Sequence, residues 1–306
     1  MLIAVDNGNK TTKSKHSAFI SGVMESSTKP GLGSDILYYK NKYYVLAAKR
    51  KGYLRNKTTD EDTFILTLFA IAKELEACGV RAGKQTTVPV ELCVGLPPAH
   101  YGTMYKAFEQ YFANRGPIEF ALDGKEYRIL INQVCVYVQA LGAYMTVFSK
   151  VRDSDCVVVD IGGFTCDLLP CKNGKPAVAE CDSLEIGVSK LYGNIVKKVN
   201  SEFDLLLDED KIDAVLQNKQ SELPYNVKQL IRQQAGNFAE NLVSALRERD
   251  IDLRTTKAVF CGGGSVLLEE YLRSNPRVGT SAIVITDISA NAKGYEILYK
   301  MAHPAT

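Results

Sequence analysis

The chain has 306 residues, of which 46% are hydrophobic and 24% are charged, and its formal net charge is +2. This composition is typical of a globular protein with two ordinary domains or one large one, and it excludes an intrinsically disordered chain. The small net charge gives no support to a broad nucleic-acid-binding surface.

Cysteine and histidine usage argues against a metal site and for a reducing compartment. The eight cysteines lie mostly inside apolar runs without C-x-x-C spacing, and the three histidines are scattered at His16, His100 and His303. We therefore expect reduced thiols and no zinc site. The first apolar run has no features of a signal peptide, and the longest run, residues 134–148, is shorter than the roughly 20 residues of a bilayer span. A soluble, cytoplasmic protein with no membrane partner is expected.

Apolar runs, alternation and turn residues define the elements expected in the first part of the chain. The strands and hairpins are residues 2–5 and 10–20 joined at Asn7-Gly8, residues 36–45 around Asn41-Lys42, residues 88–94, and residues 120–131 around Asp123-Gly124. The helices are residues 59–79, 101–112 and 134–150. Lys49-Arg-Lys51 is predicted to be a solvated charge cluster.

The same order of elements restarts after Asp155. The expected strands are residues 156–169, 178–186 after a turn at Asn173-Gly174, 257–260 and 283–285. The expected helices are residues 189–199, 265–274 with Ser265 as its N-cap, and 290–301, together with a polar helical segment over 202–254. Strands that alternate with helices twice, each time after a similar hairpin, predict a duplicated α/β architecture whose cleft is the default binding site.

Two stretches share the pattern D-x-G-x-x-T, and each follows an apolar strand. The shared residues are Asp6, Gly8 and Thr11 in the first stretch and Asp160, Gly162 and Thr165 in the second. A hairpin tip rich in glycine and asparagine presents several backbone N–H groups in one direction, as phosphate binding requires. Asp6 and Asp160, at the strand ends, are placed to hold a hydrated Mg²⁺ against the phosphates. One such hairpin alone is usually an ordinary turn, whereas two matched ones indicate phosphate binding.

Further candidate ligands lie in the same hairpins and in a glycine-rich turn. The other hairpin candidates are Asn7, Asn9, Lys10, Thr12, Lys13, Gly163 and Phe164. In the third element, Gly262, Gly263, Gly264 and Ser265 stand between a strand and a helix, where a ligand can approach the backbone and the helix N-terminus. The chain contains no G-x-x-x-x-G-K-[ST] and lacks G-x-G-x-x-G spacing at this turn, so a P-loop and a dinucleotide-binding fold are poorly supported.

The two hairpins, the Gly262-Gly-Gly264 turn and their order resemble the actin, sugar kinase and heat-shock chaperone superfamily. Within it the chain is most similar to the bacterial plasmid-segregating actins of the ParM type. Gly95-Leu-Pro-Pro-Ala-His-Tyr101 resembles their G-L-P-x-x-x-Y segment, and residues 289–295 resemble their A-N-x-x-G-Y ending.

The resemblance implies a duplicated actin-like fold of two related domains around a nucleotide cleft. It implies a first domain over residues 1–150, joined by the C-terminal helix 287–306. It implies a second domain over residues 151–286, with a small helical subdomain at about 200–254.

The resemblance also implies ATP and Mg²⁺ as cofactors, with GTP as the alternative nucleotide. A water positioned by Gln139, on the helix before the second hairpin, would attack the γ-phosphate, and such hydrolysis needs no nucleophilic residue. Alternatively, Gln139 is a buried polar group bonded to backbone. Asp167 either orients the second loop or the water, or it caps the hairpin. Lys190 and Asn194, with Gly263 and Gly264, are the implied adenine contacts.

The implied function is a polymerising ATPase that self-associates into filaments. Its filaments would move plasmid DNA through a separate DNA-binding adaptor, without direct contact to nucleic acid. A small-molecule kinase is one alternative, although no acid is evidently placed as base for a sugar hydroxyl. A nucleotide-gated scaffold is another, although no apolar stripe follows the last helix to dock on a membrane.

Overall fold

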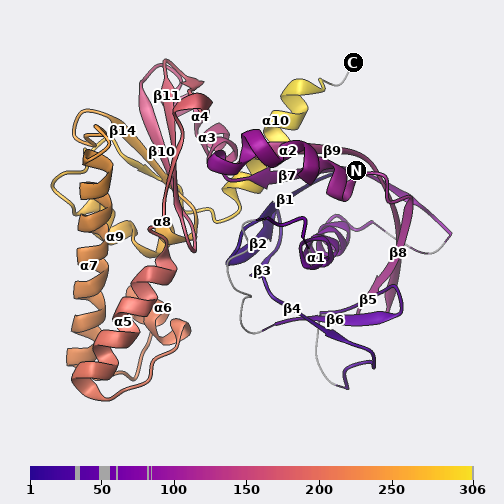
Figure 1. Cartoon of the computed structure of the whole chain (residues 1–306), viewed down its shortest axis with the longest axis horizontal. Helices are drawn as coiled ribbons and strands as arrows, with labels where there is room; N and C mark the ends of the chain where they lie inside the picture. The colour runs from indigo at the N-terminus through magenta and orange to yellow at the C-terminus, as the bar shows by residue number, and fades with distance from the viewer. Residues whose placement is uncertain (32–34, 48–55, 60, 81–82, 84, 305–306) are drawn as a thin grey trace. The chain divides into compact units, whose positions relative to one another are not determined.

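The computed structural model describes residues 1–31, 35–47, 56–59, 61–80, 83 and 85–304 (Figure 1). The chain forms two compact units, the first made of Met1–Thr146 with Ser289–Thr306 and the second of Val147–Ile288. The cluster Lys49-Arg-Lys51, for which solvation was predicted, lies outside the described residues. Among the described residues, the helices are too short or too polar to cross a membrane.

The first unit is built on one nine-stranded sheet of order β3-β2-β1-β7-β9-β8-β5-β6-β4. Its strands are β1 (Leu2–Asn7), β2 (Thr11–Ser14), β3 (Ala18–Ile20), β4 (Val23–Ser26), β5 (Ile36–Tyr39), β6 (Lys42–Leu46), β7 (Val88–Leu96), β8 (Pro117–Leu122) and β9 (Lys125–Val138). Its helices are α1 (Asp62–Ala77), α2 (Pro98–Phe112), α3 (Leu141–Thr146) and α10 (Ala290–Ala302). Figure 1 shows the strands curving around α1.

Helices cover both faces of the central strands of this sheet. Ile3 and Val5 of β1 belong to the hydrophobic core that contains the buried face of α1. Ala4, between them, belongs instead to a cluster with Tyr295 of α10. Because successive residues of a strand point to opposite faces, β1 is apolar along its length, as expected of a strand buried on both sides.

The second unit is built on a six-stranded sheet, in which β12-β11-β10-β14-β15 form a path and β13 pairs with β11. Its strands are β10 (Cys156–Ile161), β11 (Cys166–Lys172), β12 (Lys175–Pro176), β13 (Asp182–Leu184), β14 (Lys257–Cys261) and β15 (Ile283–Val284). Its helices are α4 (Phe148–Val151), η1 (Val178–Glu180), α5 (Val188–Phe203), α6 (Glu209–Leu216), α7 (Tyr225–Arg247), α8 (Gly263–Leu267) and α9 (Glu269–Arg273). The apolar faces of α5, α6 and α7 share one hydrophobic core with β10 and β14.

The same pairing pattern occurs at the centre of each unit. In the first, β1 pairs antiparallel with β2 and parallel with β7. In the second, β10 pairs antiparallel with β11 and parallel with β14. The predicted duplicated α/β fold is therefore confirmed.

The helix predicted over residues 134–150 is wrong in its first part. Strand β9 continues to Val138 and pairs in parallel with β7 up to Leu96, and helix α3 begins only at Leu141. The segment Val134-Cys-Val-Tyr-Val138 is rich in β-branched residues, and a short apolar run buried in a parallel sheet lacks the alternation that distinguishes a strand from a helix.

Three other predicted elements are divided in the structure. Residues 10–20 form two strands, β2 and β3, rather than one. Residues 178–186, predicted as a strand, contain η1 and the short β13. Residues 265–274, predicted as one helix, form α8 and α9.

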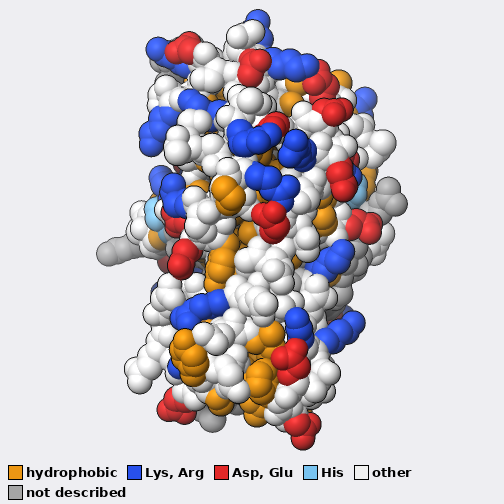
Figure 2. All heavy atoms as spheres, turned by 90° about the vertical axis from the view of Figure 1, so that its left-hand side faces the viewer, with side chains coloured by type: hydrophobic (Ala, Val, Ile, Leu, Met, Phe, Trp, Pro, Cys, Tyr) orange, Lys and Arg blue, Asp and Glu red, His pale blue; other side chains and the backbone are white. Residues whose placement is uncertain are grey.

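The surface mixes charges of both signs. On the face shown in Figure 2, Lys and Arg side chains lie beside Asp and Glu side chains, with hydrophobic side chains exposed between them. This distribution agrees with the small net charge of +2.

Candidate functional site

The first hairpin consists of β1, β2 and the connecting residues 8–10. Its register pairs Asp6 with Lys13 and Asn7 with Thr12. A Cβ on Gly8 would lie 2.5 Å from the carbonyl oxygen of Thr11, so the turn requires glycine at this position. The Gly8 N–H donates to the Asp6 carbonyl at 3.0 Å. The tip is therefore a tight turn that directly follows the buried Asp6.

Each oxygen of the Asp6 carboxylate has a polar partner. Its side chain is buried, with the whole residue only 3% exposed. Gln139 donates from Nε2 to Oδ1 at 2.7 Å, and the Lys13 Nζ lies 3.7 Å from Oδ2. A positive charge and an amide donor thus fix this acid at the end of its strand.

Gln139 does not lie on a helix, contrary to the prediction. It follows the last residue of β9, and its backbone N–H donates to the Leu96 carbonyl at 2.8 Å. The alternative of a buried polar group bonded only to backbone does not hold either, because its side chain bonds the Asp6 carboxylate.

Residues outside the motif support the first hairpin. Ser21 donates from Oγ to the Gly8 carbonyl at 2.6 Å and lies 2.9 Å from the Thr12 hydroxyl. Lys57, which is 5% exposed, donates from Nζ to the Asn7 carbonyl. Ser21 and Lys57 were not predicted from the sequence, because neither has a fixed spacing to the D-x-G pattern and only the fold brings them to it.

Asn7 presents a buried acceptor. Its Nδ2 donates to the Thr67 hydroxyl at 2.9 Å, and that hydroxyl donates to the Thr63 carbonyl at 2.8 Å, which fixes the orientation of the amide. The remaining Oδ1 atom has no hydrogen-bond partner among the residues that the structure describes. Because a buried polar atom is nearly always bonded, this oxygen marks a place for a water or a ligand donor beside Asp6.

The second hairpin consists of β10, β11 and the connecting residues 162–165, and it repeats the first. Its register pairs Asp160 with Asp167, seven residues apart as Asp6 and Lys13 are. The Gly162 N–H donates to the Thr165 carbonyl at 2.8 Å, and a Cβ on Gly162 would lie 3.0 Å from that same oxygen. Equivalent glycines therefore approach equivalent threonine carbonyls in the two hairpins.

Two acids face each other in the second hairpin where the first has an acid and a lysine. Asp160 and Asp167 are directly opposite on neighbouring strands, and both are buried. The Ser183 hydroxyl of β13 donates to Asp167 Oδ1 at 2.5 Å. Burial, and then the nearby Asp167 and Asp160, raise the pKa of the Cys166 thiol well above its usual range. Opposed carboxylates repel each other when both are ionised, so this pair suits a cation.

The glycine-rich turn packs directly on the second hairpin. Gly262 has φ +84°, and a Cβ there would lie 2.3 Å from Asp160 Oδ1. A Cβ on Gly264 would lie 2.4 Å from Cγ2 of Ile161. Helix α8 begins at Gly263, so Ser265 is not the predicted N-cap; its hydroxyl lies inside the helix and donates to the Cys261 carbonyl.

Helix α5 starts on the tip of the second hairpin. The N–H groups of Val188 and Ser189 donate to the carbonyls of Gly162 and Gly163 at 3.1 and 2.9 Å. A Cβ on Gly187 would lie 2.3 Å from the carbonyl carbon of Phe164, so the close approach of α5 to the hairpin requires glycine here, which the sequence did not indicate. Lys190 and Asn194 are both exposed and stand one turn apart on α5.

The terminal A-N-x-x-G-Y segment holds the chain just after Gln139. Asn291 Oδ1 accepts from the N–H groups of Ala140 and Ala143 at 3.0 and 3.1 Å. A Cβ on Gly294 would lie 1.8 Å from the Gly142 carbonyl oxygen, so α10 and α3 touch backbone to backbone. The buried Tyr295 packs against Gly142 as well. Helix α10 therefore sets the position of the turn that carries Gln139.

The predicted site residues are divided between the two units. In the first unit they are Asp6, Asn7, Gly8, Asn9, Lys10, Thr11, Thr12, Lys13 and Gln139. In the second unit they are Asp160, Gly162, Gly163, Phe164, Thr165, Asp167, Lys190, Asn194, Gly262, Gly263, Gly264 and Ser265.

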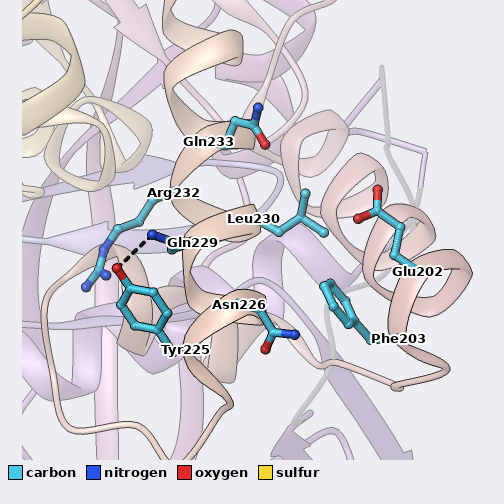
Figure 3. Close-up of a pocket in the computed structure, with 8 residues that line it drawn as sticks. All are labelled: Glu202, Phe203, Tyr225, Asn226, Gln229, Leu230, Arg232 and Gln233. Carbon is cyan, nitrogen blue, oxygen red and sulfur yellow. Dashed lines mark hydrogen bonds between the residues drawn. The ribbon is translucent and has the colours of Figure 1, made fainter.

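A groove of about 600 Å³ on the helical part of the second unit contains none of these residues (Figure 3). Its lining comes from the end of α5 and the first part of α7: Glu202, Phe203, Tyr225, Asn226, Gln229, Leu230, Arg232 and Gln233. Gln229 donates from Nε2 to the Tyr225 hydroxyl at 2.7 Å. The groove is therefore separate from the hairpin residues.

Two family models match the chain. The N-terminal domain of actin-like proteins matches residues 4–142, and the C-terminal domain of the archaeal actin homologue MreB-like family matches residues 158–274. No curated protein sequence matches.

Solved structures of actin homologues share the fold. An archaeal actin homologue superimposes with a TM-score of 0.76 at 20% identity over 99% of each chain. Its complex with ADP gives 0.75 at 19% identity, over 98% of this chain and 99% of that one. A ParM from Clostridium botulinum, solved as a 15-stranded filament, gives 0.74 at 15% identity, over 98% and 99% of the two chains.

Proposed function

Because the chain belongs to the actin-like proteins, we propose that it binds and hydrolyses ATP with Mg²⁺ and assembles into filaments. The observation that carries the proposal is the equivalence of the two hairpins. Each has a buried acid at a strand end, followed two residues later by a glycine packed on the carbonyl of a threonine. One such turn would be an ordinary structural feature, whereas two matching glycine tips, each beside a buried acid, fit a nucleotide with several phosphates.

The donor set fits Mg²⁺ and phosphate. Asp6 in the first unit and Asp160 in the second are each proposed to supply a hard carboxylate oxygen to hydrated Mg²⁺, and Asn7 Oδ1 is an acceptor for a metal-bound water. The ion, when bound, neutralises charge on the phosphates. Lys13 and Lys57 add positive charge at the first hairpin.

The other assigned residues would bind the remaining parts of the nucleotide. The phosphate ligands are Asn7, Gly8, Asn9, Lys10, Thr11, Thr12, Gly162, Gly163, Phe164 and Thr165. The ligands of the nucleoside are Lys190, Asn194, Gly262, Gly263, Gly264 and Ser265.

Gln139 is the residue proposed to position the attacking water. Its amide NH₂ is committed to Asp6, so its carbonyl oxygen is the part available to accept a hydrogen bond from water. Asp167, opposite Asp160, is proposed to hold the second hairpin and its water in place. Catalysis by such groups is positioning and charge stabilisation.

Filament formation is proposed from the fold and from the ParM relative, which was solved as a filament. We further propose that filaments in the cytoplasm move plasmid DNA through a DNA-binding adaptor, rather than by direct contact with nucleic acid. The sequence resemblance to ParM-type proteins supports this finer role.

Light scattering and phosphate release measured together test the proposal. Adding ATP and Mg²⁺ to the full chain is expected to raise scattering, to give filaments in electron micrographs and to release phosphate. Repeating the assay with GTP tests the nucleotide preference. The Asp160→Ala variant should keep the fold by circular dichroism but lose phosphate release. Turnover that requires an added small-molecule acceptor, with no assembly at any protein concentration, would instead favour a kinase.

A further inference from the structure

Three side chains with metal-ligating atoms meet in the first unit, away from the hairpin tip. His16 lies in the turn between β2 and β3, Glu74 lies in the last turns of α1, and Cys78 follows the end of α1. One ligand atom from each, the histidine nitrogen, a carboxylate oxygen and the thiol sulfur, lies within 4.8 Å of the other two. The Cys78 N–H donates to the Glu74 carbonyl at 3.0 Å, which sets Cys78 one turn after Glu74 at the end of α1.

The Glu74 carboxylate is already oriented for a further ligand. Its Oε1 accepts from the Ser14 hydroxyl at 2.6 Å and from the His16 N–H at 2.7 Å. Its Oε2 lies 2.7 Å from His16 Nδ1. Such outer hydrogen bonds orient the carboxylates of metal sites. Because Oε1 is occupied, Oε2 is the oxygen directed toward the imidazole.

We propose that His16 Nδ1, Glu74 Oε2 and Cys78 Sγ bind one Zn²⁺ ion. Imidazole, carboxylate and thiolate are the three donor types that zinc takes, and three protein ligands leave a fourth position for water. In a tetrahedral site ligand atoms lie about 3.3–3.8 Å apart, since zinc bonds to nitrogen and oxygen are about 2.1 Å and to sulfur about 2.3 Å. The His16 side chain is 41% exposed and Cys78 is also exposed, so small side-chain rotations reach this spacing and the ion enters from solvent.

Binding has a definite proton balance. Zinc binds at the Nδ1 and Oε2 atoms that now share a hydrogen bond, and the single proton of the neutral imidazole is on Nε2 in the zinc-bound form, whichever ring nitrogen carried it before. The Cys78 thiol gives its proton to solvent and binds as thiolate. No oxidant or reductant is needed.

The site would clamp the β2–β3 turn to the end of α1. His16 and Glu74 are 58 positions apart in the sequence, which is why spacing alone indicated no zinc site. The turn lies at the opposite end of β2 from Gly8, so the clamp acts on the strand that carries Thr11, Thr12 and Lys13. Zinc binding at these residues does not require a bound nucleotide.

Cobalt substitution tests the site on the purified full chain under reducing conditions. Co²⁺ bound to a thiolate gives a sulfur-to-metal charge-transfer band, so the wild type is expected to develop this band with one equivalent of metal. Cys78→Ser should lose the band, and Cys181→Ser, which removes a half-buried thiol from the second unit, should keep it. Zn²⁺ affinity, measured by competition with a chromogenic chelator, should fall about 100-fold in Cys78→Ser and in His16→Gln. Loss of a residue that only hydrogen-bonds a metal ligand already lowers metal affinity by up to about 100-fold, so loss of a ligand should cost at least as much.

The matched control for His16→Gln is His303→Gln, since His303 is exposed in the same unit. This variant should bind Zn²⁺ like the wild type. Melting curves without metal should coincide for Cys78→Ser and the wild type, because Cys78 is exposed. A wild type without the charge-transfer band, or a Cys78→Ser variant that binds Zn²⁺ as tightly as the wild type, overturns the site.

Discussion

Gln139 donates a hydrogen bond to Asp6 across 133 positions of sequence, at a distance of 2.7 Å. The bond joins the end of β9 to the end of β1, two strands separated in the sheet by β7 alone. It places the residue proposed to orient water directly on the acid proposed to hold Mg²⁺. The side chain of Asn291 in α10 accepts a hydrogen bond from the N–H of Ala140, the residue that follows Gln139.

Replacing Gln139 by Ala should separate turnover from binding. We expect ATP turnover to fall about 100-fold, the cost of misplacing a reacting group, while ATP affinity changes little. Single-turnover phosphate release and equilibrium binding of a fluorescent ATP analogue measure the two effects. Gln133→Ala, an exposed glutamine on the same strand, is the control and should behave as the wild type. Equal turnover in the two variants would remove Gln139 from the mechanism.

Gly262→Ala should destabilise the second unit, whereas Gly263→Ala should not. A Cβ at Gly262 would meet Asp160 Oδ1 at 2.3 Å in a left-handed backbone conformation, but at Gly263 it would meet nothing within 4 Å. The strained position should cost about 1–3 kcal/mol of the free energy of unfolding. Urea denaturation of both variants measures the difference. Matching midpoints would mean that the turn does not pack on Asp160 as described.

Gly294→Ala should loosen α10 from α3. The added methyl group would lie 1.8 Å from the Gly142 carbonyl oxygen, so the helices must separate, at a cost of about 1–3 kcal/mol. Gly193→Ala is the matched control, since this helical glycine of α5 has nothing within 4 Å of the new Cβ. It should raise stability by about 0.5–1 kcal/mol, the usual gain of Ala over Gly in a helix. Thermal melting that shifts both variants in the same direction would contradict the close helix contact.

Thiol reactivity should distinguish Cys78 from Cys181. Cys78 is exposed, while burial and Asp167 raise the pKa of Cys181 to about 11. The thiolate is the reactive form, so near pH 8 only about one Cys181 side chain in a thousand is reactive, and its rate should rise about tenfold per pH unit until pH 11. Labelling followed by peptide mass spectrometry should find Cys78 modified first. Faster labelling of Cys181 at pH 8 would show that its burial is wrong.

Local patterns in the sequence were sufficient for the hairpins. A strand that ends in Asp, turns at Gly and resumes at Thr depends on interactions within about ten residues, and both D-x-G-x-x-T stretches are hairpins with equivalent registers. The helix α1 was also predictable, because its apolar residues recur at helical spacing along its sixteen residues.

Segments buried on all sides were not predictable in the same way. Residues 134–138 extend a strand because β7 provides a hydrogen-bonding partner, and a continuous apolar run carries no sign of that neighbour. The N-cap assigned to Ser265 failed for a related reason, since Gly262 already ends the strand by packing on Asp160.

The sequence by itself determined the duplicated fold and the two acid-glycine hairpins, because these depend on short-range alternation, turn chemistry and the order of elements. Only the tertiary structure decided that Gln139 bonds Asp6, that Lys57 supports Asn7, and that His16, Glu74 and Cys78 meet. Such contacts join residues tens of positions apart, and which of them form depends on how strands and helices pack, a property that no local spacing encodes.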